Sequence, residues 1–454
     1  MGFFKAYDMR GTYGVDFDLE TVYRVGCALP KVVGGTRWLV GRDGRTSSPA
    51  VHDALVKGLV AAGAEVSDLG ICSTPMVYFF TAEDGFDGSV MITASHNPPS
   101  DNGLKVSKRG ALPVGYANGL NEVERLVKAS TERFAADTPV PPVASVPEAR
   151  DRYLMWQRAR LPDLTGLRFA VDCSNGMASL FAAELFPTAV RLNATVDGSF
   201  PSHSPNPLNE AAREQIAACV RAEKLDCGVI FDGDADRAMF VDETGSFIQP
   251  DYLIPIVARE TRWAIDPDGV RAVVLHDVRT SRASLEALRA DGFTPVMVPV
   301  GHAFAKPEMR ARKALCGGEL AGHYYFSEFF NCDSGVLAAM RILGALADAK
   351  RKGQSPSAFL APICGKYANS GEVNFRVDDK PAAIRRVLAA AAQLGAETGR
   401  SDLDGYRLEY ADGWISIRQS NTEPFLRLLA ECATSDQLDV WLAKLSKAIL
   451  GNTR

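Results

Sequence analysis

Hydrophobic and polar positions follow helix-like and strand-like periods in turn along the chain. Residues 49–59 place their apolar side chains on one helical face, and the short apolar run 70–72 predicts a strand that ends in a turn at 73–75. Residues 211–224 predict a second helix, and the β-rich run 227–231 directly follows it. This alternation of helices and strands predicts parallel sheets flanked by helices.

One pattern recurs: a short apolar strand, an aspartate and then a small polar turn. The matching stretches are 38–43, 168–172 and 272–277. Their starts lie about one small domain apart, which indicates three related α/β units. The C-terminal end differs and indicates a separate α+β unit. Its predicted strands are 373–377, 414–418 and 425–429.

Composition narrows the class of protein. The 454 residues are 46% hydrophobic and 23% charged, which is ordinary for a globular protein and excludes long disorder. A net charge of -5 gives no overall attraction to nucleic acid or to an anionic membrane. No apolar run reaches the ~20 residues of a membrane span, and the first residues lack the shape of a secretory signal. The nine cysteines contain no C-x-x-C pair, which disfavours disulfides and zinc and predicts a reducing cytoplasm.

The first segment that carries chemistry is Met91–Pro99. A β-rich run delivers Ser95 into a polar turn, at the strand end where open α/β sheets bind ligands. This placement suits a serine that carries a group, although a plain turn at a strand end fits as well. A serine hydrolase is disfavoured because there is no G-x-S-x-G elbow, and because Ser95 and His96 should point apart in an extended backbone.

The second segment is an acidic loop directly after a strand. Asp232, Asp234 and Asp236 alternate along a loop that contains a glycine. Three such carboxylates can converge on one hard cation and would repel one another without it. We expect Mg²⁺, which proteins typically hold with a few carboxylates and a phosphate oxygen. The alternative is a solvated acidic turn.

The third segment, Cys316–His323, is rich in glycine. Glycines let the backbone approach a ligand closely, and Glu319 and His323 offer an acceptor and a donor suited to sugar hydroxyls. Taken by itself, the segment fits an ordinary glycine turn at least as well.

The fourth segment is a set of hydrogen-bond donors near the C-terminus. Arg418, Ser420, Asn421 and Thr422 lie in one loop, and Arg427 follows in the next strand. Such a set fits a phosphate, but it lacks the lysine and the glycines of a nucleotide P-loop. An ordinary hairpin loop is the alternative.

Together these segments resemble the α-D-phosphohexomutase superfamily, and in particular its bacterial phosphomannomutase/phosphoglucomutase group. The resemblance runs the full length of the chain in the family's order. The matching motifs are Phe4–Gly11, Thr93–Pro98, Asp232–Arg237, Gly318–His323 and Arg418–Pro424.

The resemblance implies four domains around a central cleft. Three would share a mixed α/β topology, and the fourth would be an α+β domain that resembles the TATA-binding-protein fold. Length alone, at about 150 residues per domain, predicts three domains. The expected domains are 1–146 with the phosphoserine loop, 147–247 with the metal loop, 248–360 with the sugar-binding loop and 361–454 with the phosphate-binding residues.

The resemblance also implies a reaction. Ser95 would be a phosphoserine, and Mg²⁺ would bridge its phosphate and the three aspartates. The serine phosphate would pass to a hexose phosphate, giving a hexose 1,6-bisphosphate that serves as intermediate and activator. This intermediate would turn over and return its other phosphate to Ser95, so that hexose 1-phosphate and 6-phosphate interconvert.

Further roles follow from the motif positions. Arg10 and His96 would steady the reacting phosphate, and Lys105 or His302 would move the hydroxyl proton. The residues expected to contact the substrate are Tyr7, Arg237, Arg279, Glu319, His323, Arg418, Ser420, Asn421, Thr422 and Arg427. Two positions depart from many relatives. Ala321 stands where they have serine, which removes one hydroxyl contact, and Arg279 stands where some have lysine.

Several functions stay open at this point. The first is a mutase for mannose or glucose phosphates, and the second is a mutase for glucosamine phosphate or N-acetylglucosamine phosphate. A Mg²⁺-dependent sugar phosphatase would use the same serine, and a non-catalytic sugar-phosphate-binding protein would not need it. In each case we expect a small hexose phosphate as the ligand, no nucleic acid or membrane partner, and a monomer or dimer in the cytoplasm.

Overall fold

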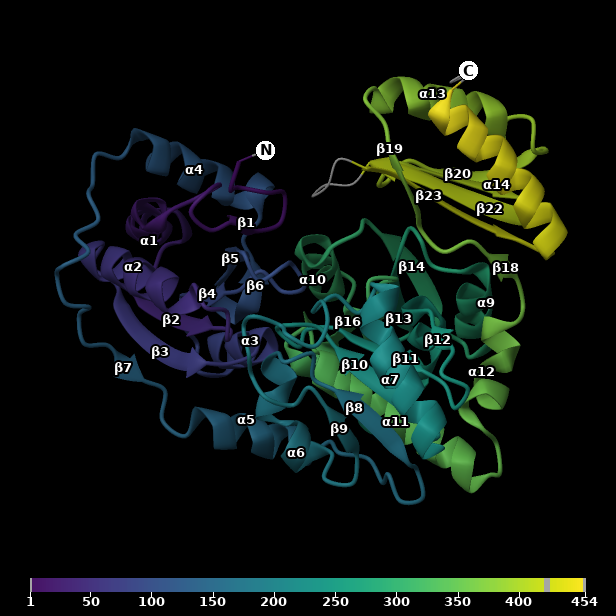
Figure 1. Ribbon diagram of the computed structural model, residues 1–454, viewed down its shortest axis with the longest axis horizontal. Coiled ribbons are helices and arrows are strands. Elements are labelled where there is room, and N and C mark those ends of the chain that lie inside the picture. The colour runs from purple at the N-terminus through teal and green to yellow at the C-terminus, as the bar shows by residue number, and fades with distance from the viewer. Residues whose placement is uncertain (1, 420–424, 452–454) are drawn as a thin grey trace.

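The computed structural model describes residues 2–419 and 425–451. Within these residues the strands form four sheets. Figure 1 shows the corresponding units in chain order, from the N-terminal unit at the left to the C-terminal unit at the upper right. None of the helices in the described part of the chain combines the length and the apolar character that a membrane span requires.

The N-terminal unit has a mixed sheet. The path through it is β1-β5-β4-β2-β3-β7, with β6 paired to β5. Strands β2, β3 and β4 run parallel, whereas β5 and β1 are antiparallel to their neighbours. The strands are β1 (Met9–Thr12), β2 (Arg37–Arg42), β3 (Glu65–Ile71), β4 (Gly88–Ile92), β5 (Asp101–Lys108), β6 (Leu112–Pro113) and β7 (Ala144–Ser145). The helices are α1 (Leu19–Val33), α2 (Ser48–Ala61), α3 (Thr74–Glu83) and α4 (Leu120–Ala129).

The second unit repeats this topology. Its path is β9-β8-β10-β11-β12, with β8 parallel to both neighbours and β11 and β12 antiparallel. Its strands are β8 (Phe169–Asp172), β9 (Val190–Leu192), β10 (Cys227–Phe231), β11 (Ala238–Val241) and β12 (Phe247–Ile248). Its helices are α5 (Ala149–Arg158), α6 (Ala182–Leu185) and α7 (Glu210–Glu223).

The third unit repeats it again, along the path β14-β13-β15-β16-β17. Its strands are β13 (Val273–Asp277), β14 (Thr294–Val298), β15 (Cys316–Gly318), β16 (Tyr324–Phe326) and β17 (Cys332–Asp333). Its helices are α8 (Ile254–Ile265), α9 (Arg282–Ala290), α10 (His302–Ala311), α11 (Gly335–Arg351) and α12 (Pro356–Cys364). The expected set of three related mixed α/β units is therefore confirmed.

The recurring aspartate lies at the carboxyl end of one parallel strand in each unit, β2, β8 or β13. Asp43, Asp172 and Asp277 each accept a hydrogen bond from the backbone N–H two residues further along, at 3.1, 2.8 and 2.7 Å. This is an Asx turn, which ends a strand with the residue's own side chain. The pattern found in the sequence thus marks one equivalent corner of three related sheets.

The C-terminal unit is the expected α+β unit. Its antiparallel path is β18-β23-β22-β21-β20, with β19 also paired to β23. The strands are β18 (Ala368–Asn369), β19 (Val373–Arg376), β20 (Glu397–Ser401), β21 (Tyr406–Tyr410), β22 (Gly413–Gln419) and β23 (Phe425–Cys432). The helices are α13 (Lys380–Ala391) and α14 (Ser435–Leu450), which Figure 1 shows together on one face of the sheet.

The first three units share one apolar core, whereas the C-terminal unit has a core of its own. One buried cluster contains Phe79 from α3, Tyr153 from α5, Phe231 from β10 and Phe329 beyond β16. Each such aromatic side chain stabilises the fold by roughly 1.5–3 kcal/mol when fully buried. The C-terminal unit has its own cluster around Ile415. The first three units therefore hold their loops on one common core.

The predicted elements agree with the structure except at one turn. The predicted helices lie in α2 and α7, and the run 227–231 is β10. The turn expected at 73–75 is wrong, because α3 begins there. The Ser73 side chain caps this helix by accepting from the Met76 N–H at 3.3 Å, and Pro75 lies in the first turn, where its missing N–H costs nothing. The domain boundaries at 146, 247 and 360 stay predictions.

Candidate active site

Three of the four predicted segments occupy the same topological position. The serine loop joins β4 to β5, the acidic loop joins β10 to β11, and the sugar-binding loop joins β15 to β16. Each loop leaves the carboxyl end of a parallel strand and enters an antiparallel one. Open sheets of this kind bind ligands at the carboxyl ends of their strands. Motif spacing alone did not reveal this equivalence.

Ser95 has a backbone conformation that glycine adopts more readily. Its φ is 52°, in the left-handed region, and the residue is fully buried. The Oγ donates to Asp232 Oδ2 at 2.8 Å and lies 3.1 Å from His96 Nδ1. The expectation that Ser95 and His96 point apart is therefore wrong, because the backbone between them is not extended.

The serine loop and the acidic loop touch directly. A Cβ atom placed on Gly233 would lie 2.4 Å from the Ser95 carbonyl oxygen, so a residue with a side chain would force the loops apart. The hydrogen bond between the two loops joins Ser95 and Asp232, which lie 137 positions apart in the sequence. Glycine at this place therefore brings the hydroxyl to the carboxylates.

Arg45 holds the serine loop from behind, a role that no sequence motif indicated. The buried guanidinium donates to the carbonyls of Ser95 and Asn97 through one nitrogen and to those of Pro98 and Asp101 through the other, at 2.6–2.9 Å. Its Nε–H donates to Asp43 at 3.1 Å. Every N–H of this side chain is thus engaged, which fixes the path of the loop.

Asp232, Asp234 and Asp236 converge as predicted. Their carboxylate oxygens lie within 4.8 Å of one another, and all three side chains are fully buried. Lys105 from β5 binds Asp234 and Asp236, each at 2.6 Å. We call these four residues and Ser95 the transfer cluster.

The transfer cluster fits a divalent cation. Within the described residues, Asp234 Oδ1 and Asp236 Oδ1 are buried without a hydrogen-bond partner. Burial raises the pKa of Asp232 well above its usual range, and repulsion from the other two aspartates adds to it. Hard carboxylate oxygens with unused lone pairs are the ligands that Mg²⁺ prefers.

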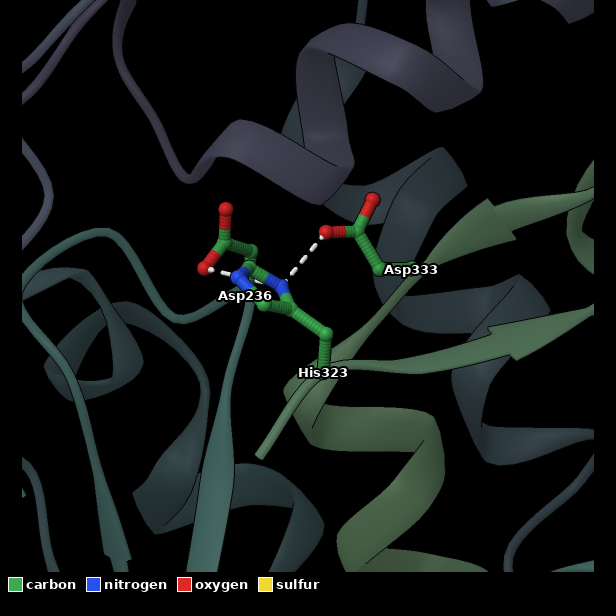
Figure 2. A group of neighbouring side chains, drawn as sticks. All are labelled: Asp236, His323 and Asp333. Carbon is green, nitrogen blue, oxygen red and sulfur yellow. Dashed lines mark hydrogen bonds and ion pairs between the residues drawn. The ribbon is translucent and has the colours of Figure 1, made fainter. Parts of the chain in front are cut away.

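A second group of possible ligands lies beside the first. Figure 2 shows His323 between Asp236 and Asp333. Arg237 donates from Nε to His323 Nε2 at 3.0 Å, so the ring proton is on Nδ1 and is donated to Asp333 at 2.8 Å. Lys306 Nζ lies 2.8 Å from Asp333 Oδ1 and neutralises the charge of this carboxylate. Because His323 Nδ1 carries a proton and a lysine already neutralises Asp333, this second group does not fit a cation.

The two predicted proton carriers have different surroundings. Burial lowers the pKa of Lys105, but Asp234 and Asp236 outweigh burial and raise it. For His302, burial and the neighbouring Lys306 lower the pKa well below its usual range. The His302 ring lies 6.3 Å from the His323 ring.

Arg10, His96 and Tyr7 complete this side of the site. Arg10 donates to Asp8 at 2.6 Å and to the Asn97 side chain at 3.2 Å, so the serine loop and β1 are joined. Burial lowers the pKa of His96 well below its usual range, and Arg237 and Arg10 add to this effect. The Tyr7 ring lies 6.3 Å from that of His302.

The remaining predicted residues gather around a carboxylate that the sequence did not single out. Arg279, Arg418 and Arg427 surround Glu372, at 3.0, 4.0 and 2.8 Å. We call these four residues the arginine cluster. Ser420, Asn421 and Thr422 lie outside the described residues.

The sugar-binding loop reaches from one cluster to the other. Its first carboxylate, Glu319, accepts from Tyr325 Oη at 2.5 Å and lies 4.0 Å from Arg279. Its last residue, His323, contacts Arg237 and Asp236 beside the transfer cluster. Ala321, between them, offers no hydroxyl.

Comparison with known proteins identifies the family. Domain models of the phosphoglucomutase/phosphomannomutase family match four consecutive stretches of the chain. These are alpha/beta/alpha domains I, II and III at residues 1–134, 156–245 and 249–367, and the C-terminal domain at residues 372–448. The chain belongs to the phosphoglucomutase/phosphomannomutase family.

Relatives in this family match over nearly the whole chain. Phosphohexose mutases of Xanthomonas campestris are 36% identical over 94% of both chains. The phosphomannomutase/phosphoglucomutase of Pseudomonas aeruginosa is 34% identical over 96% of this chain and 93% of its own. A crystal structure of a family member from Burkholderia thailandensis is 30% identical, with a TM-score of 0.85 over 98% of this chain and 96% of its own. The family resemblance predicted from the motifs is thus confirmed.

Proposed function

We propose that this enzyme interconverts hexose 1-phosphates and hexose 6-phosphates, of mannose, glucose or both, through a phosphoserine at Ser95. The observation that carries the proposal is the contact of Ser95 Oγ with Asp232, at 2.8 Å, in a buried group of three carboxylates. The family and the names of its members, phosphomannomutase and phosphohexose mutase, support the same reaction.

The transfer follows from the atoms in place. The bond between phosphorus and Ser95 Oγ breaks, a bond forms between phosphorus and the hexose hydroxyl oxygen, and the hydroxyl proton passes to a base. The product is a hexose 1,6-bisphosphate, which turns over and returns its other phosphate to Ser95. Asp232, Asp234 and Asp236 would hold Mg²⁺ beside Ser95, and the cation would supply positive charge that offsets the charge of the moving phosphoryl group.

We assign the proton transfer to His323 rather than to Lys105 or His302. With its proton on Nδ1 and donated to Asp333, His323 keeps a lone pair on Nε2, which is the form of a general base. Lys105 instead lies between two carboxylates and offsets their charge. Arg237 now donates to Nε2. When substrate is bound, this guanidinium would instead donate to a substrate phosphate and leave Nε2 free to accept the proton.

The arginine cluster binds the phosphate that is not being transferred. Guanidinium groups bind phosphate oxygens through paired N–H donors, and Arg418 and Arg427 lie opposite each other on neighbouring strands. Glu319, in the loop that reaches from the arginine cluster to the transfer cluster, lies 4.0 Å from Arg279 and would bind the sugar hydroxyls.

Phosphorus NMR tests the proposal directly. The purified enzyme is incubated with Mg²⁺ and catalytic glucose 1,6-bisphosphate, and with mannose 1-phosphate, glucose 1-phosphate or N-acetylglucosamine 1-phosphate in parallel. We expect the 6-phosphate of mannose, glucose or both, and a phosphoserine at Ser95 by intact mass and peptide mapping. Inorganic phosphate as the sole product would favour a phosphatase, and conversion of the amino sugar alone would favour the amino-sugar mutase.

A further inference from the structure

The arginine cluster brings like charges together. Arg418 in β22 and Arg427 in β23 are direct cross-strand partners, so their side chains share one face of the sheet. Like charges at such positions repel each other. Arg279 adds a third guanidinium from the neighbouring unit. An arrangement of this kind requires an anion.

Glu372 is the anion that all three guanidinium groups share, while Asp277 also binds Arg279 at 2.6 Å and Asp404 lies 3.4 Å from Arg418. Its Oε1 binds Arg427 at 2.8 Å, and its Oε2 binds Arg279 at 3.0 Å and lies 4.0 Å from Arg418. Burial raises the pKa of Glu372, but the three arginines outweigh burial and lower it. One ionised carboxylate is therefore shared by all the arginines that the proposed function assigns to a phosphate.

The backbone fixes Glu372 in this place. The residue directly precedes β19, which pairs with β23 from Val373 onward. The preceding Gly371 has a φ of +63°, and its N–H donates to the Asn369 side chain at 2.8 Å. Asn369 in turn donates to Glu431 at 2.9 Å. The carboxylate is thus held by a defined turn at the joint to the C-terminal unit.

The arginines keep capacity for a second anion. Within the described residues, the Nε of Arg418 is buried without a hydrogen-bond partner. The Nε and one terminal nitrogen of Arg279 are engaged by Asp277, so only its other terminal nitrogen faces Glu372. A phosphate that enters this cluster can bind this Arg418 Nε, but contacts with the Arg279 and Arg427 nitrogens that bind Glu372 require it to share or take over those donors.

We propose that Glu372 competes with the sugar phosphate for the arginine cluster and so weakens phosphate binding there. The inference rests on the proposed function, in which the bisphosphate releases this phosphate in every turnover before it presents the other one to Ser95. Tight binding of the phosphate at this cluster stabilises the hexose phosphate and the bisphosphate equally, so it does not speed the transfer. It only slows the release of the phosphate. A built-in carboxylate replaces the departing phosphate and keeps the arginines neutralised.

The test compares Glu372→Gln with the wild type. Glutamine has nearly the same shape as glutamate but no charge, so the arginine N–H groups would be available to bind the phosphate. We expect the dissociation constant of inorganic phosphate, measured by calorimetry on the dephosphorylated enzyme, to fall about tenfold, the size of one charge-assisted hydrogen bond. The KM for hexose 1-phosphate should fall with it, and kcat should fall because release is slower.

Control variants separate competition from a structural role. Glu409→Gln removes a carboxylate that binds Arg407 and Arg282 at the same joint, away from the arginine cluster, and should leave phosphate binding unchanged. Glu372→Asp keeps the charge but shortens its reach, and should tighten phosphate binding less. It replaces the glutamine variant if that one does not fold.

The outcomes are distinct. Weaker or unchanged phosphate binding in Glu372→Gln, or the same tightening in Glu409→Gln, overturns the proposal. Because calorimetry does not depend on turnover, a wild-type enzyme without mutase activity would refute the proposed function while this binding result still decides the role of Glu372.

Discussion

The transfer cluster and the arginine cluster are opposite in charge and in mechanical setting. In the first, Lys105 lies 2.6 Å from two of the three buried carboxylates, while Arg237 lies 3.6 Å or more away. In the second, three guanidinium groups face Glu372. The first has more carboxylates than close cations, and the second concentrates guanidinium groups around one shared carboxylate, with Asp277 on Arg279 and Asp404 beside Arg418. We therefore propose a cation as the ligand of the first and a phosphate as the ligand of the second.

Their setting differs as well. The transfer cluster joins loops that share one apolar core across the first three units. The arginine cluster lies at the joint to the C-terminal unit, where the apolar contact is the small group Leu320, Trp414 and Leu429. Bond making needs fixed atoms, whereas the repeated capture and release of a phosphate does not. In the proposed reaction, precise positioning and ligand exchange would therefore take place in different parts of the molecule.

The largest effect should come from removing the group carrier. Ser95→Ala should lower mutase turnover by roughly 10⁴-fold or more, as loss of a nucleophile does, while phosphate binding at the arginine cluster stays the same. Phosphorus NMR and calorimetry measure the two. Ser100→Ala, an exposed serine of the same loop, is the control. Substantial turnover in Ser95→Ala would rule out the phosphoserine mechanism.

The next effect concerns the proton. His323→Asn should reduce kcat by about 10³-fold, the typical contribution of a general base, whereas His302→Asn should reduce it far less. Asparagine can still donate to Asp333, so the fold is retained. Steady-state kinetics of both variants across pH 6–9 provide the measurement. A larger loss in His302→Asn would move the assignment to His302.

A single charge in the transfer cluster should act through the metal. Asp234→Asn should raise the Mg²⁺ concentration needed for half-maximal activity about 100-fold, because it removes one ligand charge from three. A Mg²⁺ titration of initial rates measures this. Asp242→Asn, which alters a carboxylate in the β11–β12 turn, should leave the titration unchanged. An unchanged titration in Asp234→Asn would mean that the acidic loop does not hold the cation.

On the other side of the comparison, Arg418→Ala should impair retention of the intermediate rather than transfer to it. We expect turnover to fall by about 10- to 100-fold, and more bisphosphate to escape into solution, because a charge-assisted contact to the phosphate is lost. Coupled assays of product and of free bisphosphate quantify both. Arg376→Ala, an exposed arginine on β19, serves as the matched control. Normal retention in Arg418→Ala would contradict the phosphate assignment.

The smallest effect on turnover should come from the support behind Ser95. Arg45→Lys keeps the charge but lacks the fork of donors that binds four loop carbonyls, so it should destabilise the fold by about 3 kcal/mol and slow turnover about tenfold. Urea unfolding and the rate of Ser95 phosphorylation by bisphosphate provide the readouts, with exposed Arg109→Lys as control. Loss of stability with normal phosphorylation would limit Arg45 to a structural role.

The sequence predicted these clusters unevenly. The three aspartates alternate within one loop, so local spacing was sufficient to bring them together. That Ser95 lies beside them depends on how two sheets pack, and only the family resemblance indicated it. Arg45 and Glu372 were missed because each looks like an ordinary charged residue near a turn. Their roles come from contacts with residues far along the chain, such as Glu372 with Arg279.

Local conformation was the other source of error. Neighbouring side chains point to opposite sides of a strand, which is why Ser95 and His96 were expected to diverge. The φ of 52° at Ser95 means that the backbone here is not a strand, so this alternation does not apply. The turn expected after β3 is a helix start, because serine followed by proline two positions later suits both. Fold class was easier to predict, since apolar periodicity and the repeated strand-then-aspartate pattern extend over whole units.

The equivalent position of the three loops has a consequence for inheritance. If one ancestral unit was repeated three times, its copies began with the same loop between the same two strands. In the proposed reaction, each copy would since have specialised, one for a nucleophile, one for a cation and one for a sugar. No single copy carries the chemistry alone, because Ser95 meets Asp232 only where two copies are apposed. The proposed reaction thus requires several copies packed together. The strands could stay the same in every copy while the loops diverged.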